Sequence, residues 1–182
     1  MSLSSEERSE LVALARAAVD AQVSGKAPPE ATRADGIFGE TRGCFVTLTH
    51  AGRLRGCIGH FSPPEPLGRM VVEMAAAAAK DPRFVMDPIT IDEVPQLDVQ
   101  VSVLSPLVET HEPEKLLIGT HGIYVSNGYR SGCFLPEVAT DQDWSAQEFL
   151  SYCCSHKAGL GPDAWRMIDT KVYLFTSEKF SE

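Results

Sequence analysis

The chain has 182 residues, of which 43% are hydrophobic and 23% are charged, and its formal net charge is −9. This composition is typical of a folded globular protein and excludes an extended disordered chain. Because non-specific duplex binding depends on neutralised phosphates, the acidic balance disfavours nucleic acid as a partner. A local basic patch could still bind a small anion.

Cysteine usage and the absence of a signal sequence indicate the compartment. The cysteines are odd in number and include no CxxC pair, whereas a secreted disulfide framework favours even counts. They are Cys44, Cys57, Cys133, Cys153 and Cys154. The first seven residues lack the basic start and apolar stretch of a signal peptide. The longest apolar run, residues 74–79, is far too short to cross a bilayer. We therefore expect a cytoplasmic protein with reduced thiols and no membrane association.

The first half of the chain is predicted to form a helix, a hairpin, a second helix and a strand. The helix covers residues 5–23, and Ser4 and Glu7 have the spacing of a capping box at its start. Residues 44–48 and 53–58 alternate as two strands around a short turn.

The remainder of this half contains a helix and one further strand. Apolar residues recur at helical spacing from residue 67 to about residue 80, where Asp81-Pro82 ends the helix. Residues 97–103 then alternate as a half-buried strand.

The second half repeats this order. Strands are predicted over residues 123–125 and 129–135, joined by the turn residues Ser126-Asn127-Gly128. A helix over residues 145–156 and a strand over residues 172–176 follow.

The similarity of the two halves extends to individual residues. Arg55-Gly56-Cys57-Ile58 lies 76 positions before Ser131-Gly132-Cys133-Phe134, at the same point of each hairpin. We predict an α+β fold in which residues 1–182 form one domain by internal duplication. Its two β-β-α-β halves, residues 36–105 and 106–178, would share one curved, barrel-like, mainly antiparallel sheet. A chance match of two hairpins is the alternative.

The densest motif, residues 52–61, places Gly56 and Gly59 within one strand. Glycine weakens a strand, so two of them indicate either a bulge or tight corner, or a place where a ligand or second backbone approaches closely. Spacing alone leaves both interpretations open.

Cys57 also has two interpretations. A strand cysteine is usually a small hydrophobic core residue. Alternation, however, predicts that Arg53, Arg55 and Cys57 share one face of the strand, where the two cations, with His60 nearby, would lower a thiol pKa. That arrangement favours a thiolate nucleophile or an anion pocket.

A buried arginine needs a partner, because an unpaired buried charge is very costly. Arg55 is therefore expected either to pair with a carboxylate, for which Glu73 and Glu137 are candidates, or to face a wet pocket. Arg83 follows the first-half helix and is either an exposed arginine or a second cation in the same pocket.

Two Cys–His pairs offer a candidate zinc site. Cys57 and His60 with Cys154 and His156 could supply four ligands, but they lack the repeated CxxC spacing of a strong zinc motif. We therefore expect neither a metal nor a cofactor.

Leu54-Arg55-Gly56-Cys57-Ile58-Gly59 resembles the hallmark hexapeptide of the AMMECR1 family. Further segments resemble the family over nearly the whole chain. They are residues 43–48, 79–84, 101–104, 134–138 and 157–160.

The resemblance implies an α+β fold of duplicated strand–helix units around a barrel-like sheet. It also implies association with Memo-like and radical-SAM-like partner proteins. The family usually has glutamine where this chain has Glu137 and a small hydroxyl residue where it has His60. No role for an amide at position 137, and no general catalytic role for His60, is therefore carried over.

Two functional hypotheses follow. In the first, the chain is an enzyme acting on a small anionic or carbonyl-bearing substrate, with Cys57 as the candidate nucleophile and Arg55 assisting it. In the second, it is a non-catalytic binding or adaptor module that holds a partner protein on the same surface. Beside Cys57 and Arg55, the candidate ligand-binding residues are Leu54, Gly56, Ile58, Gly59, Arg83 and Glu137.

Overall fold

The computed structural model describes residues 3–181, which divide into two compact units. One unit comprises the described residues up to Leu104 together with the C-terminal segment from Glu178, and the other comprises Ser105–Ser177. Each unit contains a four-stranded sheet and its own hydrophobic core. None of the helices within residues 3–181 is long and apolar enough to cross a membrane.

The predicted first helix is confirmed as α1 (Ser5–Val23). The Ser4 hydroxyl accepts a hydrogen bond from the Glu7 N–H, and the Glu7 carboxylate accepts one from the Ser4 N–H, so the predicted capping box is also present. These contacts satisfy backbone donors that have no partner inside the helix.

The sheet of the first unit has the strand order β2-β1-β3-β8. Its strands are β1 (Cys44–His50), β2 (Arg53–His60), β3 (Asp98–Leu104) and β8 (Ser177–Ser181). β1 pairs antiparallel with both β2 and β3. β2 lies at the end of the strand order and is therefore an edge strand, with one side unpaired by any other described strand of this sheet.

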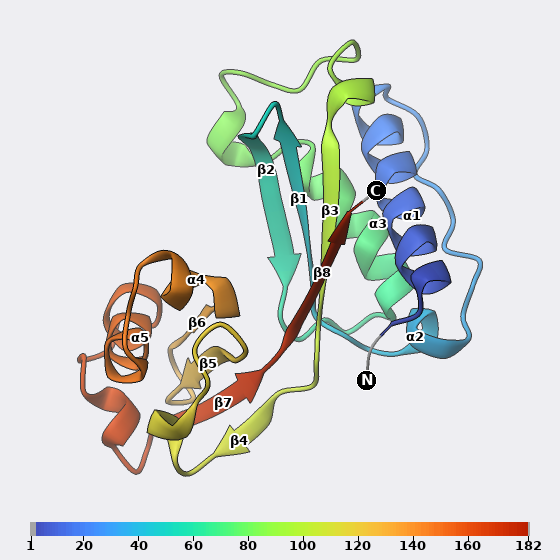
Figure 1. Ribbon diagram of the computed structural model, residues 1–182. Helices are drawn as coiled ribbons and strands as arrows, with labels where there is room; N and C mark the ends of the chain where they lie inside the picture. Colours follow the sequence, from blue (N-terminus) through green and yellow to red (C-terminus); the bar gives the residue numbers. More distant parts are fainter. Residues whose placement is uncertain (1–2, 182) are drawn as a thin grey trace. The chain divides into compact units, whose positions relative to one another are not determined.

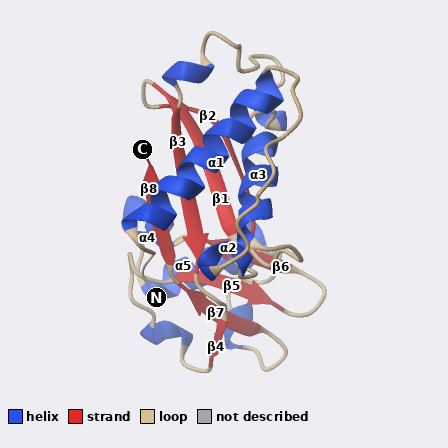
Figure 2. Ribbon diagram, turned by 90° about the vertical axis from the view of Figure 1, so that its right-hand side faces the viewer, coloured by secondary structure: helices blue, strands red, loops and turns tan. Residues whose placement is uncertain are grey.

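Helices α1 and α3 (Leu67–Ala78) cover one face of this sheet, and a short helix α2 (Gly36–Gly39) lies beside α3 (Figures 1 and 2). The inward side chains of β1 alternate with outward ones, and Cys44, Val46 and Leu48 are completely buried. The core is formed by these side chains and the apolar faces of α1 and α3.

The second unit has the strand order β4-β7-β5-β6. Its strands are β4 (Val108–Thr110), β5 (Gly122–Ser126), β6 (Ser131–Phe134) and β7 (Lys171–Phe175). Its helical elements are a turn at Pro113–Lys115, α4 (Pro136–Asp141), α5 (Ala146–Tyr152) and a turn at Ala164–Arg166. The helix predicted over residues 145–156 is found in two parts: the α-helix α5 ends at Tyr152, and a π-helical turn follows over Cys153–Lys157.

The prediction of an α+β fold is confirmed, but the prediction of one sheet shared by both halves is wrong for the described strands. Each of the two sheets also contains one short strand that the sequence did not reveal. β8 completes the first sheet beside β3, and β4 completes the second beside β7. The duplication itself stays a prediction.

Candidate functional site

The hairpin of β1 and β2 contains a β-bulge at Arg55. Leu48 pairs with Gly56 and Thr49 pairs with Leu54, so Arg55 is an extra residue on β2. A bulge shifts the alternation of side chains by one position. The predicted common face of Arg53 and Cys57 is therefore wrong, since the register places Leu54 on the face of Cys57.

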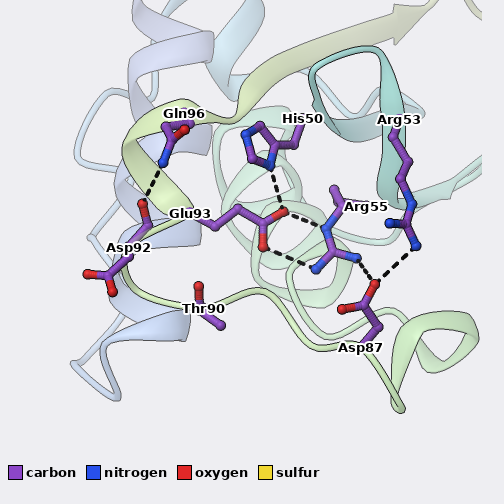
Figure 3. Close-up of a pocket in the computed structure, with 8 residues that line it drawn as sticks. All are labelled: His50, Arg53, Arg55, Asp87, Thr90, Asp92, Glu93 and Gln96. Atoms are coloured by element: carbon purple, nitrogen blue, oxygen red, sulfur yellow. Dashed lines mark hydrogen bonds and ion pairs between the residues drawn. The ribbon is translucent and has the colours of Figure 1, made fainter.

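Arg55 is 5% exposed and forms the centre of a charged network. Its Nε and Nη2 donate to the two carboxylate oxygens of Glu93 at 2.5 and 3.1 Å, and its Nη1 donates to Asp87 Oδ2 at 3.0 Å. Figure 3 shows the Glu93 carboxylate between Arg55 and His50, whose Nδ1 lies 3.3 Å from Glu93 Oε1. Arg53 reaches the same Asp87 oxygen at 3.1 Å.

The Arg55–Glu93 contact has the bidentate geometry of a strong charge-assisted pair. Its hydrogen bonds hold the pKa of Glu93 below its usual range and raise the pKa of Arg55. The expectation that Arg55 pairs with a carboxylate is met by Glu93 and Asp87, not by Glu73 or Glu137.

A polar pocket of about 370 Å³, here called the Arg55 pocket, surrounds this network. It is lined by His50, Arg53, Arg55, Asp87, Thr90, Asp92, Glu93 and Gln96. Three carboxylates outnumber two arginines in this lining, so its formal charge is negative when His50 is neutral. Neither Cys57 nor Arg83 lines the pocket.

Gly56 and Gly59 are required by packing. A Cβ on Gly56 would lie 2.0 Å from the carbonyl oxygen of Ala78, the last residue of α3, and a Cβ on Gly59 would lie 2.2 Å from the Phe45 ring. Both distances are far inside van der Waals contact. The sequence offered a bulge or the close approach of a ligand or second backbone as reasons for these glycines. At Gly56 both a neighbouring bulge and the close approach of a second backbone are found.

Cys57 is held chiefly through its backbone. Its N–H donates to Asp81 Oδ2 at 3.0 Å, and its carbonyl accepts from Arg83 Nη2 at 3.0 Å. Since β2 is an edge strand, these side chains occupy backbone groups that another strand could otherwise pair with. The half-buried Cys57 thiol accepts a hydrogen bond from the Thr47 hydroxyl, at a distance of 3.3 Å.

The contacts among Cys57, Asp81 and Arg83 are here called the clasp. Asp81 is its buried residue, with a side chain that is 1% exposed. It accepts the Arg83 N–H at 3.0 Å as well as the Cys57 N–H, and it forms an ion pair with the Arg83 guanidinium. The guanidinium contributes most to holding the pKa of Asp81 well below its usual range, and the two backbone N–H groups add to the effect.

These contacts share one target, the segment Asp81–Glu93 between α3 and β3, here called the 81–93 loop. Arg55 binds Glu93 at its distal end and Asp87 in its middle, and the backbone of Cys57 binds its proximal end at Asp81 and Arg83. The guanidinium carbons of Arg55 and Arg83 also lie 6.0 and 5.8 Å from the centre of the Phe84 ring.

The fastened loop exposes apolar side chains. Val85 is 74% exposed and Met86 is 93% exposed, and Ile91 is 60% exposed near the distal end. Single exposed apolar residues are common on protein surfaces. Three within seven residues of a loop held at both ends form a candidate binding surface.

A sequence profile of AMMECR1 matches residues 12–180. The chain belongs to the AMMECR1 family. It is 39% identical over 191 residues to a protein from Methanothermobacter thermautotrophicus, covering 99% of this chain and 96% of that protein. It is also 42% identical over 191 residues to a protein from Methanopyrus kandleri, covering 99% and 90% of the two chains.

An AMMECR1-like fold has been solved in an uncharacterised protein from Pyrococcus horikoshii. That crystal structure matches the chain with a TM-score of 0.83 and 39% sequence identity, covering 99% of this chain and 93% of the other.

The other predicted site residues of this AMMECR1 chain are distributed over both units. Leu54 is 36% exposed on β2, and Ile58 packs against the first core. Glu137 belongs to the second unit, in the first turn of α4. Within residues 3–181, no group of three or more His, Cys, Asp or Glu side chains is placed to hold a metal ion.

Asp87 and Glu93 were not among the predicted site residues, and Asp81 was predicted only to end a helix. A signal for Asp81 was available, because Asp81-Pro82 begins a turn and an aspartate there often accepts nearby backbone N–H groups. No periodic pattern marks Asp87 or Glu93, which lie in irregular chain.

Proposed function

We propose that this AMMECR1 protein is a non-catalytic binding module whose partner docks on the 81–93 loop. The observation that carries the proposal is the common target of Arg55, Gly56 and Cys57. Arg55 forms ion pairs with the loop, Gly56 admits the end of α3 from which the loop begins, and the Cys57 backbone clasps the loop's first residues.

The hexapeptide thus gives the loop a fixed shape. An ordered binding surface loses less conformational entropy on association than a flexible one. Val85, Met86 and Ile91 would supply the apolar contact area, and the charged groups around Arg55 would form a polar rim. As partners we propose the Memo-like and radical-SAM-like proteins that the family resemblance implies.

The test is a binding measurement with the Memo-like and the radical-SAM-like protein of the same organism. Met86→Asp should weaken binding by about tenfold or more, the loss of a moderate hot-spot contact. Met167→Asp is the matched control, because Met167 is also exposed but lies in the second unit. If neither protein binds the wild-type chain, or both variants bind alike, the docking proposal is wrong.

The competing enzymatic hypothesis assigns Cys57 as a nucleophile acting on a small anionic or carbonyl-bearing substrate. The half-buried thiol beside Thr47 is the observation in its favour. Against it, the Arg55 guanidinium is directed at Glu93 and Asp87. Cys57→Ser separates the two hypotheses, since a docking module keeps its partner affinity while a cysteine enzyme loses its activity.

We also propose that the two units arose by duplication. In each, the first strand of the hairpin pairs with the second strand and with the strand that follows the helix. A Cβ on Gly132 would lie 2.4 Å from the Ala158 backbone nitrogen, as a Cβ on Gly56 would lie 2.0 Å from Ala78. Superposition of the hairpins should align Gly56 with Gly132 and place the following helices on the same face.

A further inference from the structure

An apolar pocket of about 440 Å³ lies between the C-terminal end of α3 and the 81–93 loop. Its apolar lining comes mainly from Pro82, Phe84, Val85, Pro88 and Ile89. The volume is within the range of sites that bury a small ligand or a large side chain. The pocket is distinct from the polar Arg55 pocket, although Arg55 contributes to both.

Three charged side chains also line this apolar pocket, and two of them are neutralised. Arg55 is paired with Glu93 and Asp87, and Asp81 is paired with Arg83. The third, Lys80, is exposed, and it has no ion-pair partner among the described residues. The pocket therefore combines an apolar interior with one positive charge that forms no ion pair among the described residues, although Lys80 also lines a neighbouring pocket that contains Glu73.

We propose that this pocket anchors an apolar side chain of the docked partner, and that Lys80 binds a carboxylate next to it in the partner's sequence. This inference rests on the proposed docking function and specifies the chemistry of the segment that docks. Apolar anchors in preformed pockets dominate many interfaces. A charge beside such an anchor fixes its register and excludes partners with the wrong sign.

An acidic neighbour fits this pocket better than a basic one. A lysine or arginine beside the anchor would face Lys80 without an unpaired carboxylate in the lining to offset the repulsion. A carboxylate would instead form an ion pair with Lys80, and because Lys80 is exposed this contribution should weaken as salt is added.

Two dipeptides test the inference without any partner protein. N-acetyl-Leu-Glu-amide and N-acetyl-Leu-Lys-amide are titrated into ¹⁵N-labelled protein and followed by amide chemical shifts. The glutamate peptide should change the amide chemical shifts of Lys80, Phe84, Val85 and Ile89. Its dissociation constant should be at least about fivefold lower than that of the lysine peptide, a difference in binding free energy of about 1 kcal/mol. Shifts confined to other residues, or equal affinities, would overturn the inference.

Lys80→Glu should reverse the preference between the peptides. Lys26→Glu is the matched control, because it makes the same charge change at an exposed lysine outside the pocket. If Met86→Asp weakens partner binding but the peptides are not discriminated, the inference fails and the docking proposal stands. If the glutamate peptide binds as expected but neither partner protein binds, the pocket takes a free apolar carboxylate, and both the docking proposal and the partner-segment inference are overturned.

Discussion

Replacing Asp81 with asparagine tests the clasp that fastens the 81–93 loop to β2. The carboxylate accepts N–H groups from both Cys57 and Arg83, and its side chain is 1% exposed. Asparagine has one acceptor oxygen, so its amide NH₂ would face the other N–H donor. Loss of one hydrogen bond to a buried charge costs about 1.5–3 kcal/mol.

The Arg83 guanidinium contributes most to lowering the pKa of Asp81, but solvent screens its ion pair, so the pair adds less to this magnitude than a fully buried pair would. The Arg83 side chain is 57% exposed, and exposed pairs contribute about 0–1 kcal/mol. We therefore expect Asp81→Asn to lower the free energy of unfolding by about 2–3 kcal/mol at pH 7. In a chain of this size that corresponds to a drop in Tm of roughly 4–12 °C.

The pH dependence identifies the carboxylate as the cause. The pKa of Asp81 is lowered in the folded protein, whereas the pKa of an aspartate in an unfolded chain is about 3.9. Its stabilisation is therefore complete well above pH 4 and is lost as the pH falls through the folded pKa. The difference in the free energy of unfolding between wild type and Asp81→Asn should therefore become smaller below about pH 4.

Urea unfolding at pH 7, 5 and 3 measures this difference, with Asp163→Asn as the control. Asp163 is 81% exposed, so its replacement should change stability by less than about 0.5 kcal/mol. A difference that is the same at all three pH values would refute the assigned role of the charge. If Asp81→Asn is as stable as the control at pH 7, the clasp does not stabilise the fold.

Two further predictions concern packing and thiols. Gly56→Ala should lower the free energy of unfolding by about 1–3 kcal/mol, because its Cβ would overlap the Ala78 carbonyl. Gly161→Ala, whose Cβ would meet nothing within 4 Å, should change the free energy of unfolding by less than about 0.5 kcal/mol. Equal unfolding curves for the two variants would contradict the close approach at Gly56. Thiol titration of denatured, unreduced protein should find five free groups, and a disulfide would contradict this. In the native protein Cys44 and Cys133 should react slowly, because burial raises their pKa to about 12 and about 11.

The elements with a regular hydrophobic period were predictable from the sequence. α1 and its capping box, the β1–β2 hairpin and α3 lie close to their predicted ranges. β4 and β8 were not predictable, since β4 has three residues and β8 buries Phe180 as its one large apolar side chain. Such short strands form because a neighbouring strand offers unpaired backbone groups, which no local pattern records.

Pairing with a carboxylate was one of two alternatives that the sequence offered for Arg55, and Glu93 and Asp87 supply that carboxylate. The sequence could not identify that carboxylate, because Glu93 lies 38 positions away in irregular chain. The assumed strand alternation also failed, since the bulge at Arg55 depends on the register with β1. Both errors concern pairing between distant segments, to which local periodicity is insensitive.

The two hairpins separate packing from function within one chain. Gly56 and Gly132 each admit the backbone of the following helical segment, so this glycine serves the fold of either unit. The residue before the glycine, however, is Arg55 in the first hairpin and Ser131 in the second. Serine cannot form the bidentate ion pair that fastens Glu93. Arg55 therefore distinguishes the hairpin of the first unit from that of the second, and under the docking proposal partner binding should depend on the first unit.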